Sequence, residues 1–445
     1  MNTWRGSLQR LFQYPSAVVG TFVVFLLVFT AIYAMVKIPY REAIRLWRGG
    51  EEVWYQNPKF APPAWVNLFS SKKYVESFSV RTSDGSLAKT VEGGDQDVTT
   101  YTMNYSFDFN YDYYPQEMIV YVTSTFAEKQ PFISLEWLKP DGETVRIANL
   151  AVGQKHTYRF SQDDKLKTKL RTQEIIPVLF SLPEQNVPEK GTYQLLITGT
   201  TFEPNSDINV EFVLHGQVFG LAGTDHARRD LVVPLLWGAP VALAFGLIAS
   251  LGTAILTMVI SALGAWYGTW VDELIQRITE INLVLPFFSI LILIGTFYSR
   301  SIWVILGATI LLSIFTGAIK GYRSIFVQLK ESPYIEAARA YGASNPRIVF
   351  LYLIPRMIPL LIPGLVLSVP TFVFLEAGLA VLGLGDPVLP TWGKMIEDAN
   401  RNAALYRGYY YWILEPTVLL MVTGLGFAML GFALDRVFNP KLRDA

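Results

Sequence analysis

The residue types that carry most catalytic and metal-binding chemistry are scarce in this sequence. It has no Cys, which excludes thiol catalysis, thiolate metal sites and a disulfide framework. Its three His (His156, His215 and His226) are scattered and do not predict a metal site. No GxxxxGK[ST] segment occurs, so the chain lacks the phosphate loop that would bind ATP. We therefore expect a protein that is not an enzyme and that binds no metal or cofactor itself.

The most informative polar stretch is 332–359, which lies between two apolar segments. Ser332 is suited to precede a helix and Pro333 to be its first residue. Gly342 offers a left-handed residue for the end of that helix, and Pro346 blocks its continuation. Three alanines keep the helix narrow. The stretch therefore predicts a short, exposed helix between two membrane spans, of a size to fit a groove on a partner protein.

Long uncharged windows surround this stretch. The chain is 51% hydrophobic, and its mean hydropathy is positive. The windows are 18–36, 231–271, 281–299, 301–319, 357–375 and 416–434. A span needs about 20 residues to cross a bilayer about 30 Å thick, so each window predicts one helix. In the longest window we place the span at about 240–266, after a lead-in at 231–238, rather than a hairpin turning near Gly252. We expect the first window to be a retained anchor rather than a cleaved signal peptide.

The region 39–222 contains no such window. Apolar and polar residues alternate from Tyr101 to Tyr111, which is the periodicity of a strand. Further strand-like runs are Met118–Thr123, Phe132–Leu138, Thr192–Thr198 and Ile208–Leu214. Turn signals separate these runs, and we predict an antiparallel β-sandwich-like domain. Residues 41–75 read as a connector that is helical at first and then rich in Pro.

Charge sets the expected orientation. The loop 320–356 carries six Lys and Arg against two acids, which predicts a cytoplasmic position. Six spans then place both termini in the cytoplasm and the β domain outside the cell membrane. The domains expected are 1–38 with the first span, 39–222 as the extracytoplasmic β domain, and 223–445 as a core of five further spans. The β region has 18 Lys and Arg against 23 Asp and Glu, which suits a solvated body.

Four cations after the first span oppose this orientation: Lys37, Arg41, Arg45 and Arg48. They outnumber the positive residues before the span, Arg5 and Arg10. We expect the later loops to override them.

The polar stretch contains a spaced motif. Glu336-Ala337-Ala338 is followed by Gly342, and Pro355 comes thirteen residues after that glycine. This resembles the EAA-x3-G-x9-I-x-L-P signature of the coupling loop in ABC importer permeases. Tyr352 and Ile354 stand where Ile and Leu are usual, and both are bulky and apolar. The resemblance implies that the ATPase-coupling residues are Glu336, Ala337, Ala338, Arg339, Gly342, Ala343 and Pro355.

A second motif precedes the second span. Gly223-Thr224-Asp225 followed by Arg229-Asp230 resembles the GTD-x2-GRD segment of permeases from dipeptide, oligopeptide and nickel importers. Arg228 replaces the usual Gly of that segment. We favour a structural ion-pair network here over a catalytic role.

Later segments extend the resemblance over 223–443. Glu376-Ala377 and Thr391-Trp392-Gly393 resemble the stretch between the last two spans, and Asn439-Pro440 with Leu442-Arg443 resembles the closing segment. For Glu376, Trp392 and Gly393, a place in the pathway and a role in helix packing are both open. The region 39–222 lies outside the resemblance.

The resemblance implies the membrane subunit of an ATP-driven importer. Its partners would be a second homologous permease, two ATPase subunits that hold ATP and Mg, an extracytoplasmic substrate-binding protein and membrane lipid, with no nucleic acid. Peptides are the expected cargo, with nickel or an oligosaccharide as alternatives. A reading from another class is a membrane-anchored receptor or adhesin that acts through its β domain.

Overall fold

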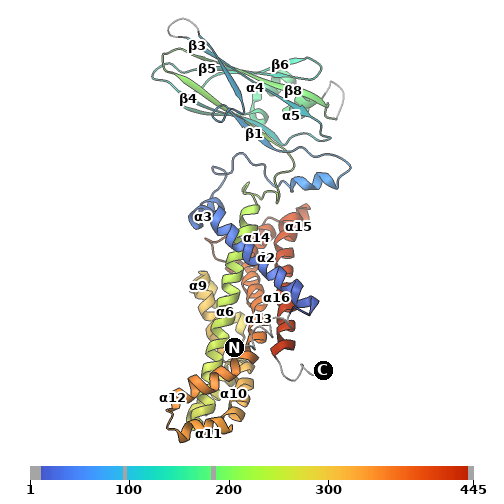
Figure 1. Cartoon of the computed structure of the whole chain (residues 1–445). Coiled ribbons are helices and arrows are strands. Elements are labelled where there is room, and N and C mark those ends of the chain that lie inside the picture. The colour runs from blue at the N-terminus through green and yellow to red at the C-terminus, as the bar shows by residue number, and fades with distance from the viewer. Residues whose placement is uncertain (1–11, 94–97, 182–186, 439–445) are drawn as a thin grey trace. The chain divides into compact units, whose positions relative to one another are not determined.

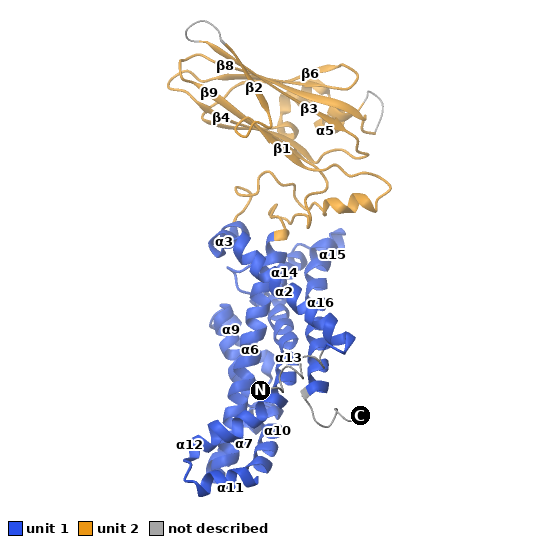
Figure 2. Cartoon of the chain, viewed as in Figure 1, with its two compact units in different colours: residues 1–48, 233–445 blue, residues 49–232 orange. Residues whose placement is uncertain are grey.

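The computed structural model describes residues 12–93, 98–181 and 187–438. The chain divides into two compact units: Met1–Arg48 with Val233–Ala445, called here the helical unit, and Gly49–Val232, called the β unit (Figure 2). The closing motif at 439–443 and the cations Arg5 and Arg10 lie outside the described residues.

The β unit contains two antiparallel sheets (Figure 1). The four-stranded sheet has the order β1-β9-β4-β7, formed by Phe78–Arg81, Asp207–His215, Glu117–Thr125 and Lys155–Arg159. The five-stranded sheet has the order β2-β3-β8-β5-β6, formed by Ala88–Gly93, Thr99–Phe109, Gly191–Thr201, Phe132–Leu138 and Thr144–Ala151. The five predicted strand runs are confirmed as β3, β4, β5, β8 and β9. Strands β1, β2, β6 and β7 were not predicted from the sequence.

One apolar core is shared by both sheets of the β unit. At its centre the ring of Phe180 lies 4.7 Å from that of Phe109 and 4.9 Å from that of Tyr193. Phe180 ends α5 (Ile175–Phe180), a short helix that the sequence analysis did not foresee, as it did not foresee α4 (Asp164–Leu170). Asp163 caps α4 by accepting from the backbone N–H of Leu166 at 3.0 Å.

The unit boundaries differ from the predicted 39 and 222 by ten residues. Helix α3 (Tyr40–Arg48) belongs to the helical unit, because its Ala43 packs in one cluster with Trp237. The segment 223–232 belongs to the β unit. Its Thr224 hydroxyl donates to the Pro58 carbonyl at 2.8 Å. Side-chain partners far apart in sequence decide both boundaries, so local composition did not reveal them.

Besides α3, the helical unit contains the helices that cover the apolar windows and shorter helices between them. They are α2 Pro15–Lys37, α6 Val232–Tyr267, α7 Thr269–Val284, α8 Phe287–Phe297, α9 Ile302–Ile314, α10 Gly317–Lys330, α11 Pro333–Ala340, α12 Asn345–Ile348, α13 Ile354–Leu379, α14 Trp392–Arg401, α15 Ala404–Arg407 and α16 Tyr411–Phe438. Two π-helical turns, Val349–Leu353 and Ala380–Leu384, flank α13. Short 3-10 turns occur in the β unit at Ala64–Leu68 and Phe160–Gln162.

Four helical segments are long and apolar enough to cross a membrane, among the residues that the structure describes: α2, α6, the run Asn345–Leu384 and α16. Two bent pairs pass the same test together, α7 with α8 at 78° and α9 with α10 at 49°. The chain is therefore a polytopic helical membrane protein, and it reaches six spans if each bent pair counts as one.

The windows 281–299 and 301–319 are broken rather than straight helices. Pro286 separates α7 from α8, since proline has no N–H to continue the hydrogen-bond ladder. The second break follows Ile314. Here the Asn282 amide donates to the carbonyls of Leu312 at 2.9 Å and Phe315 at 2.8 Å, which satisfies backbone groups at the end of α9.

The longest window holds one helix, as predicted. Helix α6 continues through Gly252 without a turn, and no hairpin forms. The expected lead-in at 231–238 is already helical from Val232, so α6 is longer than predicted.

Candidate functional site

The loop between α10 and α13 folds as its sequence predicts. Helix α11 begins at Pro333, although the Ser332 side chain makes no capping hydrogen bond. Gly342 has φ of +78°, a left-handed conformation that glycine adopts without strain. Its N–H donates to the Arg339 carbonyl at 2.9 Å, which closes the helix end.

Helix α11 has a buried face and an exposed face. Ile335 and Ala338 point inward, and Ala338 is only 8% exposed. Glu336 and Ala337 are exposed, and so is Tyr341 in the following turn, at 93%. Tyr341 was not foreseen as a site residue. Among the other expected coupling residues, Arg339, Gly342 and Pro355 are exposed and Ala343 is half-buried.

The buried face enters a cluster that joins α6, α10, α11, α12 and the start of α13. We call it the coupling cluster; it comprises Met258, Ala262, Ala265, Trp266, Phe326, Ile335, Ala338, Ile348, Val349, Leu353, Ile354, Met357 and Leu361. Ile354, at a motif position where Leu is usual, is buried in it, and Tyr352 packs against its edge. The cluster therefore packs α11 against the end of α6 and the start of α13 (Figure 1).

Two cationic side chains also contact the end of α6 at the coupling cluster. The Arg339 guanidinium lies over the Trp266 ring, 4.5 Å from its centroid, in a cation–π contact. The Lys330 ammonium donates to the Trp266 carbonyl at 3.0 Å and the Ala265 carbonyl at 3.2 Å. These are carbonyls of the last turn of α6, where cations are favoured. Arg339 thus also anchors α11 to α6.

The second motif forms a closed structural unit. The Asp225 carboxylate is fully buried and accepts from the Arg229 guanidinium at 2.6 Å. It also accepts from the backbone N–H of Ala227 at 2.8 Å. Asp230 accepts from the N–H of Val232 at 2.9 Å, at the start of α6, and Gly223 has φ of +75°. Every polar group of Asp225 is used in the fold, which supports the structural role.

Arg228 shows why a glycine suits its position. Its φ is +65°, in the left-handed region that costs a side chain conformational strain. The side chain is buried, and its guanidinium donates to the Asn57 carbonyl at 2.6 Å and lies 3.3 Å from His215 Nδ1. Burial lowers the pKa of Arg228. Burial, and then the charge of Arg228, lower the pKa of His215 to about 4.

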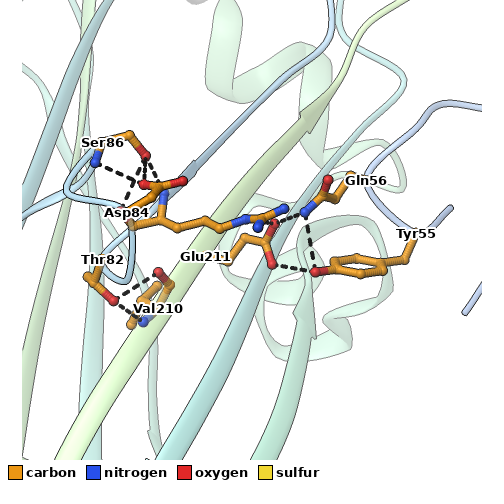
Figure 3. Close-up of polar contacts among 8 residues, drawn as sticks. Tyr55, Gln56, Thr82, Asp84, Ser86, Val210 and Glu211 are labelled. Carbon is orange, nitrogen blue, oxygen red and sulfur yellow. Dashed lines mark hydrogen bonds and ion pairs between the residues drawn. The ribbon is translucent and has the colours of Figure 1, made fainter. Parts of the chain in front are cut away.

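A polar network fixes the connector at Tyr55 and Gln56 to the four-stranded sheet (Figure 3). Glu211 on β9 accepts from the Tyr55 hydroxyl at 2.7 Å and from Arg81 Nε at 2.9 Å, and Gln56 also donates to it. These partners are more than a hundred residues apart in sequence, so no local signal revealed the network. It orders the connector against the β unit.

Trp392 and Gly393 lie in tight helix contacts. The Trp392 indole donates to the Leu235 carbonyl at 2.9 Å, and a Cβ added to Gly238 would lie 2.1 Å from the Trp392 ring. A Cβ on Gly393 would lie 2.7 Å from Ala377 Cα. These distances support packing rather than a pathway role for both. Glu376 is buried on α13, 7% exposed.

A buried ion cluster on α14 was not foreseen. Glu397 is 2% exposed and pairs with Lys394 at 2.5 Å and Arg401 at 2.6 Å. The pairs recur at helical spacings of three and four residues, a signal that the sequence did carry. Over the described ranges, no group of three or more His, Asp or Glu is arranged to hold a metal ion.

Comparison with known proteins assigns the helical unit to a family. Residues 254–444 match the model of the binding-protein-dependent transport system inner membrane component. The chain is 32% identical to the dipeptide transport system permease protein DppC of Alkalihalophilus pseudofirmus, over 50% of this chain and 72% of that protein. It is 29% identical to the oligopeptide transport system permease protein OppC of Bacillus subtilis, over 50% of this chain and 72% of that protein. It is 26% identical to the glutathione transport system permease protein GsiD of Pectobacterium atrosepticum, over 50% of this chain and 73% of that protein. The chain therefore belongs to the binding-protein-dependent transport permeases, the membrane subunits of ABC importers, and is a transport subunit rather than an enzyme.

Proposed function

We propose that this chain is one of two permeases in an ATP-driven importer of peptides, and that α11 couples it to an ATPase. The observation that carries the proposal is the division of α11 into an exposed face with Glu336 and Ala337 and a face held in the coupling cluster. A partner that pushes on the exposed face of α11 therefore also moves the helices packed against its buried face.

The coupling cluster supplies the route for that movement. It contains residues of α6, α10, α11 and α13, and Arg339 adds a contact from α11 to Trp266. Displacement of α11 would therefore tilt α6 and α13 together. Such rigid-body movements alternate access between the two sides of a membrane.

The family of the chain supports the partners proposed here. A second homologous permease completes the pathway, two ATPase subunits bind ATP and Mg, and a substrate-binding protein delivers the cargo. This chain itself binds no cofactor. The excess of cations in 320–356 supports a cytoplasmic loop, cytoplasmic termini and six spans, with the β unit on the extracytoplasmic side.

Peptide cargo rests on the relatives. The similar proteins are named as permeases for dipeptides, oligopeptides and glutathione, and the last is itself a small peptide. The aligned part of the chain is the helical core that forms the pathway, so we extend the cargo class to this chain.

Glu336→Lys tests the coupling surface. The side chain is exposed and makes no hydrogen bond or ion pair to the described residues, so folding and membrane insertion should be retained. A reversed charge at a close interface costs several kcal/mol and should abolish both ATPase copurification and peptide uptake. The measurement is ATPase recovered with the tagged permease, together with uptake of a labelled peptide.

Glu273→Lys is the matched control, because Glu273 is an exposed carboxylate on α7 outside 332–359. It should retain more ATPase binding than Glu336→Lys. Normal uptake and normal ATPase recovery with Glu336→Lys would refute the proposed coupling surface.

A further inference from the structure

A pocket of about 370 Å³ lies in the helical unit between α2, α3, α6 and α9. Its size falls in the range of small-molecule sites, about 300–1,000 Å³. Its lining includes Met35, Trp237, Ala244 and Ile248, and none of its lining side chains carries a charge. Met35 and Ile248 are nearly half exposed, so the pocket is open on the surface of the spans. An apolar occupant such as an acyl chain suits these walls.

Aromatic side chains surround the pocket. Tyr40, Trp237 and Trp303 all line it. The rings of Tyr40 and Trp237 are 5.9 Å apart, and the Trp237 indole donates to the Ile38 carbonyl at 3.0 Å. This bond fixes the corner between α2 and α3 to α6. Tyr and Trp concentrate where a membrane meets water, so the pocket opens at the level of the lipid headgroups.

Helix α3, which begins at the lining residue Tyr40, carries a cationic face. Arg41, Arg45 and Arg48 recur at spacings of four and three residues on α3, away from the buried Ala43 and Trp47. Arg45 pairs with Glu42 at 2.6 Å. Within the described residues, Arg41 and Arg48 have no ion-pair partner. Arg41 directly follows Tyr40, which lines the pocket.

We infer that this pocket binds one acyl chain of an anionic phospholipid, whose phosphate is held by Arg41 and Arg48 on α3. The guanidinium group matches a phosphate in two-point geometry, and the apolar walls take up the chain. The inference also gives a role to the cations that oppose the charge-based orientation. Arg41 and Arg48 then belong to a lipid site and do not count as an orientation signal.

The test uses the purified full chain, stripped of lipid in detergent. Native mass spectrometry compares binding of phosphatidylglycerol and phosphatidylcholine. Arg41→Gln with Arg48→Gln should weaken phosphatidylglycerol binding roughly 30-fold, which corresponds to about 1 kcal/mol for each cation. Phosphatidylcholine carries the same phosphate beside a choline cation and has no net charge, so its binding should weaken less than that of phosphatidylglycerol. Ala244→Trp, which fills the pocket without a change of charge, should weaken binding of both lipids.

The matched control is Lys320→Gln with Arg347→Gln, which removes two exposed cations near the coupling cluster. That end of α6 is remote from the pocket, so the tight phosphatidylglycerol site should persist. Equal losses in the control and in the α3 variant would overturn the inference, as would the absence of any preference for the anionic lipid.

A crosslinking measurement separates lipid from a protein occupant. A photoreactive residue in place of Trp303, in the importer complex in native membranes, should crosslink to phospholipid. Crosslinking to the second permease subunit would show that a protein covers the pocket and would overturn the inference.

Discussion

At the scale of residues, Arg228 and His215 form an unusual pair. A buried guanidinium lies 3.3 Å from His215 Nδ1, and the Tyr55 carbonyl lies 3.0 Å from Nε2. A second positive charge at His215 would be repelled by Arg228 and would lose hydration. The imidazole is therefore neutral in the folded β unit at neutral pH.

The pair predicts a pH dependence of stability. The pKa of His215 is about 4 when folded, against about 6.5 in an unfolded chain. Between these values the unfolded state binds more protons, so stability is highest above about pH 6.5 and falls as the pH drops toward 4. The loss attributable to His215 is roughly 3 kcal/mol over this range. Hydrogen exchange of β9 in the full chain, corrected for intrinsic rates, measures it.

Carboxylates also lose stabilising contacts in acid, so a variant is needed to separate the contribution of His215 from theirs. His215→Gln should reduce the loss of β9 protection between pH 6.5 and 4.5, while His156→Gln should leave the wild-type pattern. An unchanged pH dependence in His215→Gln would contradict the assigned role.

Elements with local signals were predictable from sequence, and those decided by distant contacts were not. Pro333 and Gly342 defined α11, and alternation from Tyr101 to Tyr111 defined β3. The break between α7 and α8 did carry a local signal, Pro286, which the predicted straight helix overlooked. The contact of Asn282 with Phe315 and the network around Glu211 depend on the folded chain.

At the scale of elements, Gly393 tests how α14 packs on α13. In Gly393→Ala the new methyl group would meet the backbone of Ala377 at 2.7 Å, and the backbone has little freedom to move away. Such overpacking costs about 1–3 kcal/mol. We expect a lower unfolding temperature for the full chain in detergent, measured by loss of monodisperse protein on size exclusion after heating.

Gly307→Ala on α9 is the control, because a Cβ there meets no atom within 4 Å. It should be neutral or slightly stabilising, since alanine favours helix by up to about 1 kcal/mol. Equal unfolding temperatures for the two variants would show that α14 and α13 are not held closely at Gly393.

At the scale of the whole molecule, the β unit is an insertion in the sequence of the helical unit. Its first segment, near 58–61, and its last segment, near 224–225, lie side by side. Phe60 N–H donates to the Asp225 carbonyl at 3.2 Å, and Thr224 bonds both Pro58 and Ala61. The two ends of the β unit are therefore fastened to each other. Among the described residues, those that form its apolar core all belong to the β unit. An insertion closed in this way can fold without disturbing the spans on either side.

The fragment 49–232, expressed alone, should therefore be soluble and give a β-type circular dichroism spectrum with a cooperative thermal transition. The matched fragment 49–222 ends at the boundary that composition suggested. It lacks Thr224 and Arg228, so the carbonyls of Pro58 and Asn57 lose their donors. Each lost buried hydrogen bond costs about 1–3 kcal/mol, and the shorter fragment should melt at a lower temperature or fail to fold. If both fragments melt alike, the segment 223–232 does not close the β unit. If the longer fragment is helical or unfolded, the β unit is not an independent domain.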